Sequence, residues 1–209
     1  MSLELKKTAA LKEIKKFHEL TESQIKNLED FVLLLLQENQ QFNFIGKSTI
    51  ENLWERHILD SAQLLRFIKN KNHKFADLGS GAGFPGLILS ILGLRETHLI
   101  EKAFRKAEFL RRAKSLSANR VFVHQKKLEE LSAIEFDCIL SRALAPLNQL
   151  LDYSKKFLKK DGYCLFLKGK NLNSEIELAK KTFQFEYELH SSLTSLESNI
   201  IKVFNISNI

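Results

Sequence analysis

The sequence has few of the residues that stabilise small secreted folds or bind metal ions. Of its 209 residues, only two are cysteines and two are prolines. Cys138 and Cys164 each lie in an apolar segment, with no second Cys or His at metal-ligand spacing. They indicate core thiols in a reducing compartment rather than a disulfide framework, and no metal site is expected.

Long apolar segments are lacking as well. The longest apolar run, residues 31–36, is far shorter than the roughly 18 residues that a membrane-spanning helix needs. The N-terminus also lacks the apolar region of a signal peptide. We therefore predict a cytoplasmic protein that makes no membrane contact.

Acidic residues are outnumbered by basic ones. The chain has 32 Lys and Arg against 25 Asp and Glu, a formal net charge of +7. Clustered basic side chains gain affinity for phosphates by releasing counterions, so this balance favours a polyanionic partner. With 44% hydrophobic residues, the chain is long enough for one sizeable core, and we expect a monomer.

The first 72 residues are predicted to form a helical extension packed on that core. A capping box at Thr21 and Gln24 predicts the start of a second helix, and residues 50–68 fit a third. The first helix is predicted from the apolar positions Leu5, Ala9, Leu11 and Ile14. The third is predicted from Trp54, Ile58, Ala62 and Leu65.

From residue 73 to 209, short apolar runs alternate with basic helices. This pattern predicts a Rossmann-like α/β domain with a mostly parallel seven-stranded sheet and a C-terminal antiparallel hairpin. The expected strands are residues 74–78, 97–101, 120–124, 136–141, 162–168, 183–190 and 199–206. The expected helices are residues 85–93, 104–116 and 147–160.

Glycine is scarce, with eight in the chain, yet four of them lie within residues 79–86. Gly81, Gly83 and Gly86 fit a G-x-G-x-x-G pattern, which is weak evidence alone, and no P-loop motif is present. Asp77 precedes these glycines, where a carboxylate would repel a pyrophosphate but attract an ammonium or sulfonium group. Gly79, Gly81 and Gly83 would let the backbone approach such a cofactor closely. S-adenosylmethionine is a cofactor of this kind.

An acid at the end of the next strand supports this interpretation. Glu101 stands where a ribose diol would lie in a Rossmann-like fold. Asp77, the glycines and Glu101 together form the arrangement of class I methyltransferases. A tight strand-to-helix turn with an incidental acid is the alternative.

Five segments resemble one methyltransferase family along nearly the whole chain. The sequence is similar to the small-subunit ribosomal RNA methyltransferase G family, also called glucose-inhibited division protein B. The matching segments are "FNFIG" with "RHILDS", "DLGSGAGFPGL", "EKAFRKAEFL", "HQKKLEEL", and "FDCILSRALAPL" with "LKGK".

The resemblance implies a class I fold with a helical N-terminal extension and S-adenosylmethionine as the methyl donor. It also implies a guanine N7 in the 530 loop of 16S rRNA as the acceptor. Phe84 and Leu128 would flank the adenine, and Glu129 would read its edge. Cofactor contacts would fall on Gly79, Phe84, Glu101, Lys102, Ala103, Leu128, Glu129 and Arg142. Lys127 stands where the family usually has arginine, and it is expected to contact RNA.

The acceptor chemistry can also be argued from the residues. The turn after the fourth strand reads "SRALAP", not the motif typical of exocyclic-amine methyltransferases, and both cysteines lie inside predicted strands. Guanine N7 needs neither device, because its lone pair carries no proton and has only to be aligned with the methyl group. Arg142, Lys168 and His57 are the candidates for orienting the base, with no general base expected.

Each candidate also has a structural interpretation. His57 is equally consistent with a packing residue, Arg142 with an ion-pair partner, and Asn43 with a turn former. Lys168 and Lys170 are also consistent with solvated loop lysines. The residues expected to contact RNA are Asn43, Arg105, Lys106, Arg111, Arg112, Lys127 and Lys170, although the helical ones also fit a solvated helix face.

The predicted function is thus S-adenosylmethionine-dependent methylation of 16S rRNA, in the small ribosomal subunit or its precursor particle. An RNA- or ribosome-binding module with a vestigial cofactor pocket is an alternative from a different class. A small-molecule methyltransferase is the enzymatic alternative. Cofactor binding followed by a methylation assay on ribosomal RNA separates the three.

Overall fold

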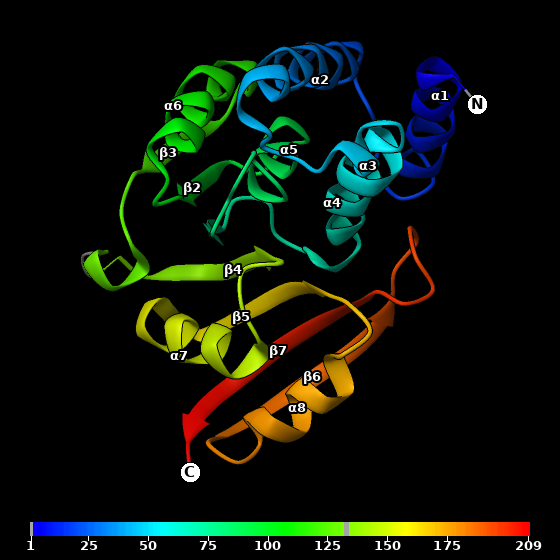
Figure 1. Cartoon of the computed structure of the whole chain (residues 1–209). Coiled ribbons are helices and arrows are strands. Elements are labelled where there is room, and N and C mark those ends of the chain that lie inside the picture. Colours follow the sequence, from blue (N-terminus) through cyan, green and yellow to red (C-terminus); the bar gives the residue numbers. More distant parts are fainter. Residues whose placement is uncertain (1, 132–133) are drawn as a thin grey trace.

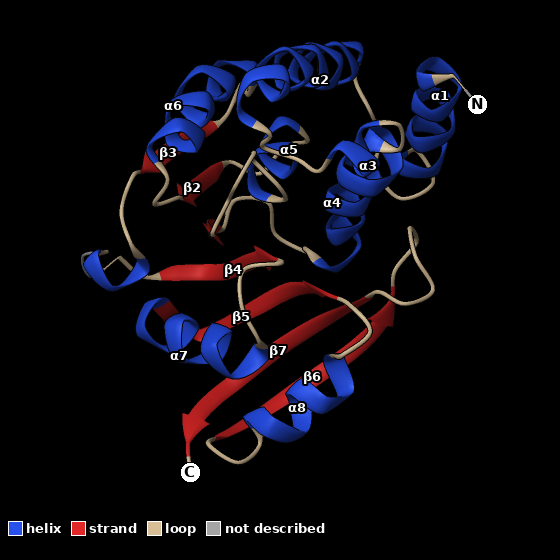
Figure 2. Cartoon of the chain, in the orientation of Figure 1, coloured by secondary structure: helices blue, strands red, loops and turns tan. Residues whose placement is uncertain are grey.

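The strands form one seven-stranded sheet in the order β3-β2-β1-β4-β5-β7-β6. The computed structural model describes residues 2–131 and 134–209 (Figures 1 and 2). Every neighbouring pair from β3 to β5 is parallel, and β7 is antiparallel to both β5 and β6. The predicted parallel sheet with a C-terminal hairpin is confirmed. The strands are β1 (Lys74–Leu78), β2 (Glu96–Ile100), β3 (Arg120–His124), β4 (Phe136–Arg142), β5 (Leu158–Lys168), β6 (Phe183–Ser191) and β7 (Asn199–Asn208).

Helices cover both faces of this sheet (Figure 1). The N-terminal helices are α1 (Leu3–Ile14), α2 (Glu22–Phe42), α3 (Lys47–Ile50) and α4 (Asp60–Ala62). The later helices are α5 (Gly86–Ile91), α6 (Phe104–Ala113), α7 (Leu147–Phe157) and α8 (Leu172–Ala179). Short 3₁₀ turns occupy Gln63–Phe67, Lys114–Leu116 and Leu128–Glu130.

Two buried clusters follow from the alternation of side chains along the strands. Cys138 and Leu165 face the cluster that includes α2, α5 and α6, whereas Ile139 and Cys164 face the cluster under α7 and α8. The first cluster also contains Phe31 and other residues of the N-terminal helices. Both cysteines are therefore buried thiols, one on each face of the sheet.

The capping box of α2 is confirmed. The Thr21 hydroxyl accepts from the Gln24 amide at 3.1 Å, and the Gln24 side chain accepts from the Thr21 amide at 3.1 Å. The predicted apolar face of α1 is wrong in part, because Leu5 is 58% exposed and Ala9 is exposed, while Ala10 and Ile14 are buried. The helix packs on residues 54–59 through the face that carries Ala10 and Ile14.

The third helix is not continuous as predicted. Residues 50–68 divide into the end of α3, a π-helical turn (Trp54–Leu59), α4 and a 3₁₀ turn. The four apolar positions that predicted it are buried all the same. In the widened turn the Asp60 amide bonds to the carbonyls of Glu55 and His57, while the Arg56 carbonyl accepts from a side chain of β4. One backbone carbonyl of this segment is thus bonded to a distant side chain.

Two further differences concern the second half of the chain. α7 ends at Phe157, and residues 158–160, expected to be helical, begin β5. α8 was not predicted, although its buried residues Leu172, Ile176 and Ala179 recur at helical spacing. No helix among residues 2–131 and 134–209 is long and apolar enough to cross a membrane.

Candidate functional site

Two adjoining cavities open at the carboxyl ends of the parallel strands, where open α/β sheets bind ligands. The glycine-loop cavity, about 470 Å³, is lined by Gly79, Gly81, Ile100, Glu101, Lys102, Lys106, Lys126, Lys127, Leu128, Glu129, Gln149 and Tyr153. The Arg142 cavity, about 520 Å³, is lined by Arg56, Asp60, Arg142, Pro146, Leu167, Lys168, Gly169, Lys170, Asn171, Glu175, Thr194 and Ser198. Ala143, Leu144 and Ala145 line both cavities and form a shared wall.

The glycines after β1 are required by the backbone. Gly79, Gly81 and Gly83 have φ values of +70°, +56° and +97°, a region that other residues rarely adopt. A Cβ atom on Gly79 would lie 2.6 Å from Leu144 Cδ1, so the glycine also permits the close approach of the shared wall. The loop therefore forms a cradle whose surface is mostly backbone.

Glu101 holds this cradle in place. One carboxylate oxygen accepts from the Gly81 amide at 2.9 Å, and the other accepts from the Ala103 amide at 2.7 Å. Each oxygen has a second lone pair available to a ligand in the glycine-loop cavity. Glu101 thus joins the glycine loop to the start of α6, a structural role that the sequence interpretation missed. Its contact with a ribose remains a prediction.

Asp77 lies behind the glycine loop and outside the lining of both cavities. One carboxylate oxygen accepts from the Gly86 amide at 2.9 Å. The other is buried without a hydrogen-bond partner among the described residues. Burial raises the pKa of this carboxyl to about 7. A direct contact between Asp77 and a cofactor was expected, but in this arrangement its carboxylate meets the loop from inside.

Phe84 and Leu128, expected to flank an adenine, lie in different surroundings. Leu128 lines the glycine-loop cavity. The Phe84 ring is buried outside both linings, stacked on His57 at a centroid distance of 4.8 Å and edge-on to Phe31 at 5.6 Å. Leu144 is the other leucine in that lining, and its contribution was missed because a leucine in a turn gives no motif signal.

Glu129 also lines the glycine-loop cavity, with its carboxylate accepting from the Tyr153 hydroxyl at 3.0 Å. Tyr153, on α7, was not singled out from the sequence. Lys102 lines the same cavity, and Ala103 begins α6 beside it. Six of the eleven residues expected at the cofactor thus line this cavity, and Arg142 lines the other one. Asp77, Gly83, Phe84 and Ala103 lie outside both linings.

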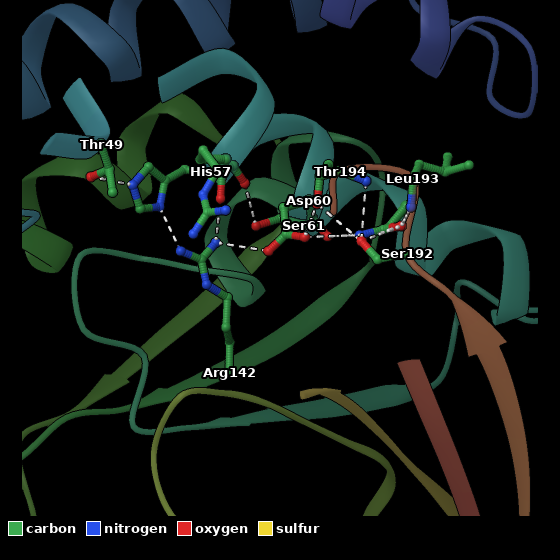
Figure 3. A network of polar contacts seen from close by, with 10 residues as sticks. Thr49, His57, Asp60, Ser61, Arg142, Ser192, Leu193 and Thr194 are labelled. Carbon is green, nitrogen blue, oxygen red and sulfur yellow. Dashed lines mark hydrogen bonds and ion pairs between the residues drawn. The ribbon is translucent and has the colours of Figure 1, made fainter. Parts of the chain in front are cut away.

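Arg142 ends β4 and points toward the N-terminal helical segment (Figure 3). Its Nη1 donates to the Arg56 carbonyl at 3.0 Å and lies 3.2 Å from Asp60 Oδ2. Its Nη2 lies 2.7 Å from His57 Nδ1, and the guanidinium lies over the Phe84 ring at 5.6 Å. Arg142 therefore joins an ion pair and lines a cavity at the same time.

His57 is buried beside this guanidinium and is neutral. Burial first, and then the charges of Arg142 and Arg56, lower its pKa to about 3. Since Arg142 has only donors, His57 Nδ1 must accept, and the ring proton sits on Nε2. That nitrogen lies 3.0 Å from the Thr49 hydroxyl, to which it donates. Both ring nitrogens are thus occupied by protein partners.

Lys168, at the end of β5, connects the shared wall of residues 143–145 to α8. Its Nζ donates to the Ala145 carbonyl at 2.9 Å and pairs with the Glu175 carboxylate at 2.5 Å. The same carboxylate accepts from the Leu147 amide at 2.7 Å, at the start of α7. Lys168 is therefore not a solvated loop lysine, whereas Lys170 is exposed on the rim of the Arg142 cavity.

The residues expected to contact RNA fall into two groups. Lys106 and Lys127 line the glycine-loop cavity together with Lys102 and Lys126. Lys170 lines the Arg142 cavity. Asn43 and the three arginines lie outside both linings: Arg105 covers the Phe42 ring at 4.5 Å, Arg111 pairs with Glu108, and Arg112 pairs with Glu38 at 2.9 Å. Asn43 has a φ of +48° and ends α2, which is the turn-forming interpretation.

Asp60 and Arg56 are site residues that the sequence interpretation missed. Both belong to the "RHILDS" segment, residues 56–61, and both line the Arg142 cavity. The segment had been singled out, but only His57 was drawn from it. A continuous helix through residues 50–68 would not have indicated which side chains face β4.

Comparison with known proteins identifies close relatives over most of the chain. A family model described as rRNA small subunit methyltransferase G matches residues 24–204. The ribosomal RNA small subunit methyltransferase G of Rickettsia felis is 40% identical over 187 residues, covering 88% of this chain and 95% of the relative. The protein of the same name from Orientia tsutsugamushi is 42% identical over 175 residues, covering 84% and 87%.

Solved structures share the fold at low sequence identity. The ribosomal protein L11 methylase of Lactobacillus delbrueckii subsp. bulgaricus superposes with a TM-score of 0.57 at 18% identity, covering 73% of this chain and 78% of that one. TYW2 of M. jannaschii, solved in complex with AdoMet, gives 0.56 at 16% identity, covering 73% and 76%. These likenesses confirm the predicted class I methyltransferase fold.

Proposed function

The chain belongs to the rRNA small subunit methyltransferase G family, and from this membership we propose that it methylates 16S rRNA with S-adenosylmethionine as donor. The proposed acceptor is N7 of a guanine in the 530 loop, in the small subunit or its precursor particle. The enzyme would act as a cytoplasmic monomer. The two cavities that share the wall of residues 143–145 carry this proposal, because methyl transfer requires the bound donor and the bound acceptor to meet.

The residues of the glycine-loop cavity fit the proposed cofactor. Its volume of about 470 Å³ lies in the usual range of small-molecule sites. Glu101 is available to ribose hydroxyls, Leu128 offers an apolar surface to the adenine, and Glu129 can accept from its amino group. When bound, S-adenosylmethionine supplies an electrophilic methyl group on a sulfonium. Lys102 and Ala103 complete the set of proposed contacts directly before α6, where the Ala103 amide itself donates to Glu101.

The Arg142 cavity fits a purine that needs orientation and no deprotonation. Guanine N7 attacks through a lone pair that carries no proton, so alignment is the main requirement. Arg142 Nη1 is engaged by the Arg56 carbonyl and by Asp60, and Nη2 by His57, so Nε and the second Nη2 hydrogen are the donors that would serve guanine O6 or a phosphate. His57 has both ring nitrogens occupied, which suits a reaction without a general base.

Two of the cations that line this cavity are paired with carboxylates, which suits a product that becomes cationic. Methylation at N7 leaves a positive charge on the purine, which unpaired cations would oppose. The Arg142 guanidinium faces Asp60, and the Lys168 ammonium faces Glu175. These two of the four cations that line the cavity are each accompanied by a carboxylate, whereas Arg56 and Lys170 make no ion pair within the described residues.

Methylation of defined substrates tests the proposal. The purified protein is incubated with labelled S-adenosylmethionine and either naked 16S rRNA or 30S particles from cells that lack it, and the modified nucleotide is mapped. We expect one 7-methylguanine in the 530 loop, and absence of that mark in RNA from the deficient cells. Cofactor binding without any transfer would favour the RNA-binding alternative, and a mark elsewhere would contradict the proposed acceptor.

A further inference from the structure

The loop between β6 and β7, residues 192–198, is tied to the N-terminal helical segment (Figure 3). The Thr194 hydroxyl donates to Asp60 Oδ1 at 2.6 Å. The Leu193 amide donates to Gln63 Oε1 at 2.7 Å, and Gln63 Nε2 lies 3.1 Å from the Ser192 hydroxyl. Side chains of residues 60 and 63 thus dock a loop that lies about 130 residues further along the chain.

Asp60 is shared between this loop and Arg142. Its Oδ1 accepts from Thr194 and, at 2.9 Å, from Gln63 Nε2, while its Oδ2 faces the Arg142 guanidinium. The Asp60 side chain is 13% exposed, and Gln63 is fully buried. The poorly solvated Asp60 carboxylate therefore connects the β6–β7 loop with the end of β4. An ion pair of this kind is costly to break from one side only.

Both elements border the Arg142 cavity. Thr194 and Ser198 of the loop form one part of its lining, and Arg142 at the end of β4 forms another. A displacement of either would change the width of the cavity and the direction of the guanidinium N–H groups. Errors of about 1 Å in the position of a reacting group can lower a rate by about a hundredfold.

We propose that Asp60 is a positioning residue for methyl transfer, which fixes the β6–β7 loop and the Arg142 guanidinium relative to each other around the acceptor nucleotide. The proposal rests on the proposed function of the same cavity. It differs from a purely structural role in one respect. A structural carboxylate would contribute to stability alone, whereas a shared positioning residue couples the kinetic effects of its two partners.

Two conservative substitutions separate the two sides of Asp60. Asp60→Asn keeps an oxygen that can accept from Thr194 but removes the charge that faces Arg142. Thr194→Val removes the hydroxyl at nearly constant size. With saturating cofactor, we expect Asp60→Asn to lower kcat by about tenfold to a hundredfold and Thr194→Val mainly to raise the KM for RNA. The double variant should lose less than the product of the two single effects, and Thr194→Ser should restore the wild-type KM.

Controls keep folding and function apart. Thr182→Val makes the same exchange in the turn before β6, where the hydroxyl makes no hydrogen bond within residues 2–131 and 134–209, and it should leave kcat and KM unchanged. Hydrogen exchange of the Leu193 amide reports the docking of the loop without any transfer reaction. We expect that exchange to accelerate at least about tenfold in Thr194→Val and to change less in Asp60→Asn, which keeps an oxygen that accepts from Thr194.

Single effects that multiply in the double variant, with unchanged Leu193 exchange, would overturn the proposal. A loss of thermal stability without any change in kcat, KM or exchange would assign Asp60 a structural role and overturn it as well. If the wild-type protein transfers no methyl group to 16S rRNA, the proposed function fails instead. The exchange measurement then still decides whether Asp60 holds the loop.

Discussion

Arg142 Nη2 lies 2.7 Å from His57 Nδ1, and this contact determines which nitrogen of the buried imidazole carries the proton. A second proton on the ring would place two donors face to face. The neutral form of His57 is therefore part of the folded site, and this has a consequence for the dependence of stability on pH.

Stability should fall in mild acid through His57. The pKa of its imidazole is about 3 in the folded chain and 6.5 in a model peptide, so only the unfolded state gains this proton between those values. The contribution of His57 is complete above pH 6.5 and is lost as pH falls toward 3. At pH 5 the free energy of unfolding should have lost at most about 2 kcal/mol through this residue.

His57→Gln isolates that contribution in chemical denaturation between pH 7.5 and pH 5. The variant should be less stable at pH 7.5, yet its stability should fall less steeply than that of the wild type. The slope that remains belongs to other histidines whose pKa values burial also lowers, namely His18, His98 and His124, and to Asp77, whose raised pKa of about 7 acts in the opposite direction. Parallel curves for the two proteins would show that His57 takes up a proton in the folded state.

Arg142 is expected to promote methyl transfer through the N–H donors of its planar guanidinium. Arg142→Ala should lower single-turnover methylation of 30S-derived RNA by about a hundredfold or more, because the remaining N–H groups can no longer orient the base. Arg142→Lys should recover only part of the rate, since a lysine cannot reach Arg56, His57 and the base together.

Stability must be measured beside these rates, because Arg142→Ala leaves the buried Asp60 carboxylate without its cation. A lower unfolding free energy is expected in that variant. Near-normal turnover of the folded alanine variant would assign Arg142 a structural role and make Lys168 the next candidate.

Glu101 should affect cofactor binding and the glycine loop together. Glu101→Gln leaves one amide nitrogen where an oxygen now accepts from Gly81 or Ala103, so one backbone N–H loses its partner. We expect a loss of about 1–3 kcal/mol in the free energy of unfolding and a tenfold or greater loss of S-adenosylmethionine affinity by calorimetry. Glu129→Gln, on the same cavity, is the control that should change affinity with little effect on stability. An unchanged affinity in Glu101→Gln would remove the ribose assignment.

Salt should distinguish the two groups of basic residues. RNA affinity should fall steeply with ionic strength, and cofactor affinity should hardly change, because only RNA binding releases counterions. Lys106→Gln and Lys126→Gln, at the glycine-loop cavity, should each lower the log–log salt slope for RNA by about 0.7–0.9 if they contact a phosphate.

Arg112→Gln is the matched comparison, since Arg112 is already paired with Glu38. Its slope should stay close to that of the wild type. The reverse ranking would move the RNA surface from the mouth of the glycine-loop cavity to the outer face of α6.

The strand segments and the glycine loop were predictable because their signals are local. Alternating apolar runs, a capping box and glycines before a proline each specify structure within about ten residues. The network around Asp60 was not predictable from the sequence. It depends on an ion pair with Arg142 and a hydrogen bond from Thr194, and no spacing rule connects these residues. The expected regular helix at residues 50–68 is instead a succession of π, α and 3₁₀ turns.

Asp77 and Phe84 illustrate the limit of motif-based assignment. A motif gives their positions along the chain, but it does not specify on which side of the backbone a side chain points. Both side chains lie inside, against Gly86 and His57, while Leu144 and Tyr153 reach the cavity from segments without a motif. The boundary between residues 72 and 73 stays a prediction, since one buried cluster contains residues from both sides of it.

Cys138 and Cys164 lie on adjacent strands but face opposite layers of helices. Because the chain has no other cysteine, each thiol is a chemical reporter placed in one layer. A reagent that alkylates exposed thiols can label Cys138 only after the layer that contains α2, α5 and α6 has separated from the sheet. It can label Cys164 only after α7 and α8 have separated from the other face. The two labelling rates therefore record the opening of the two halves of the molecule as separate events.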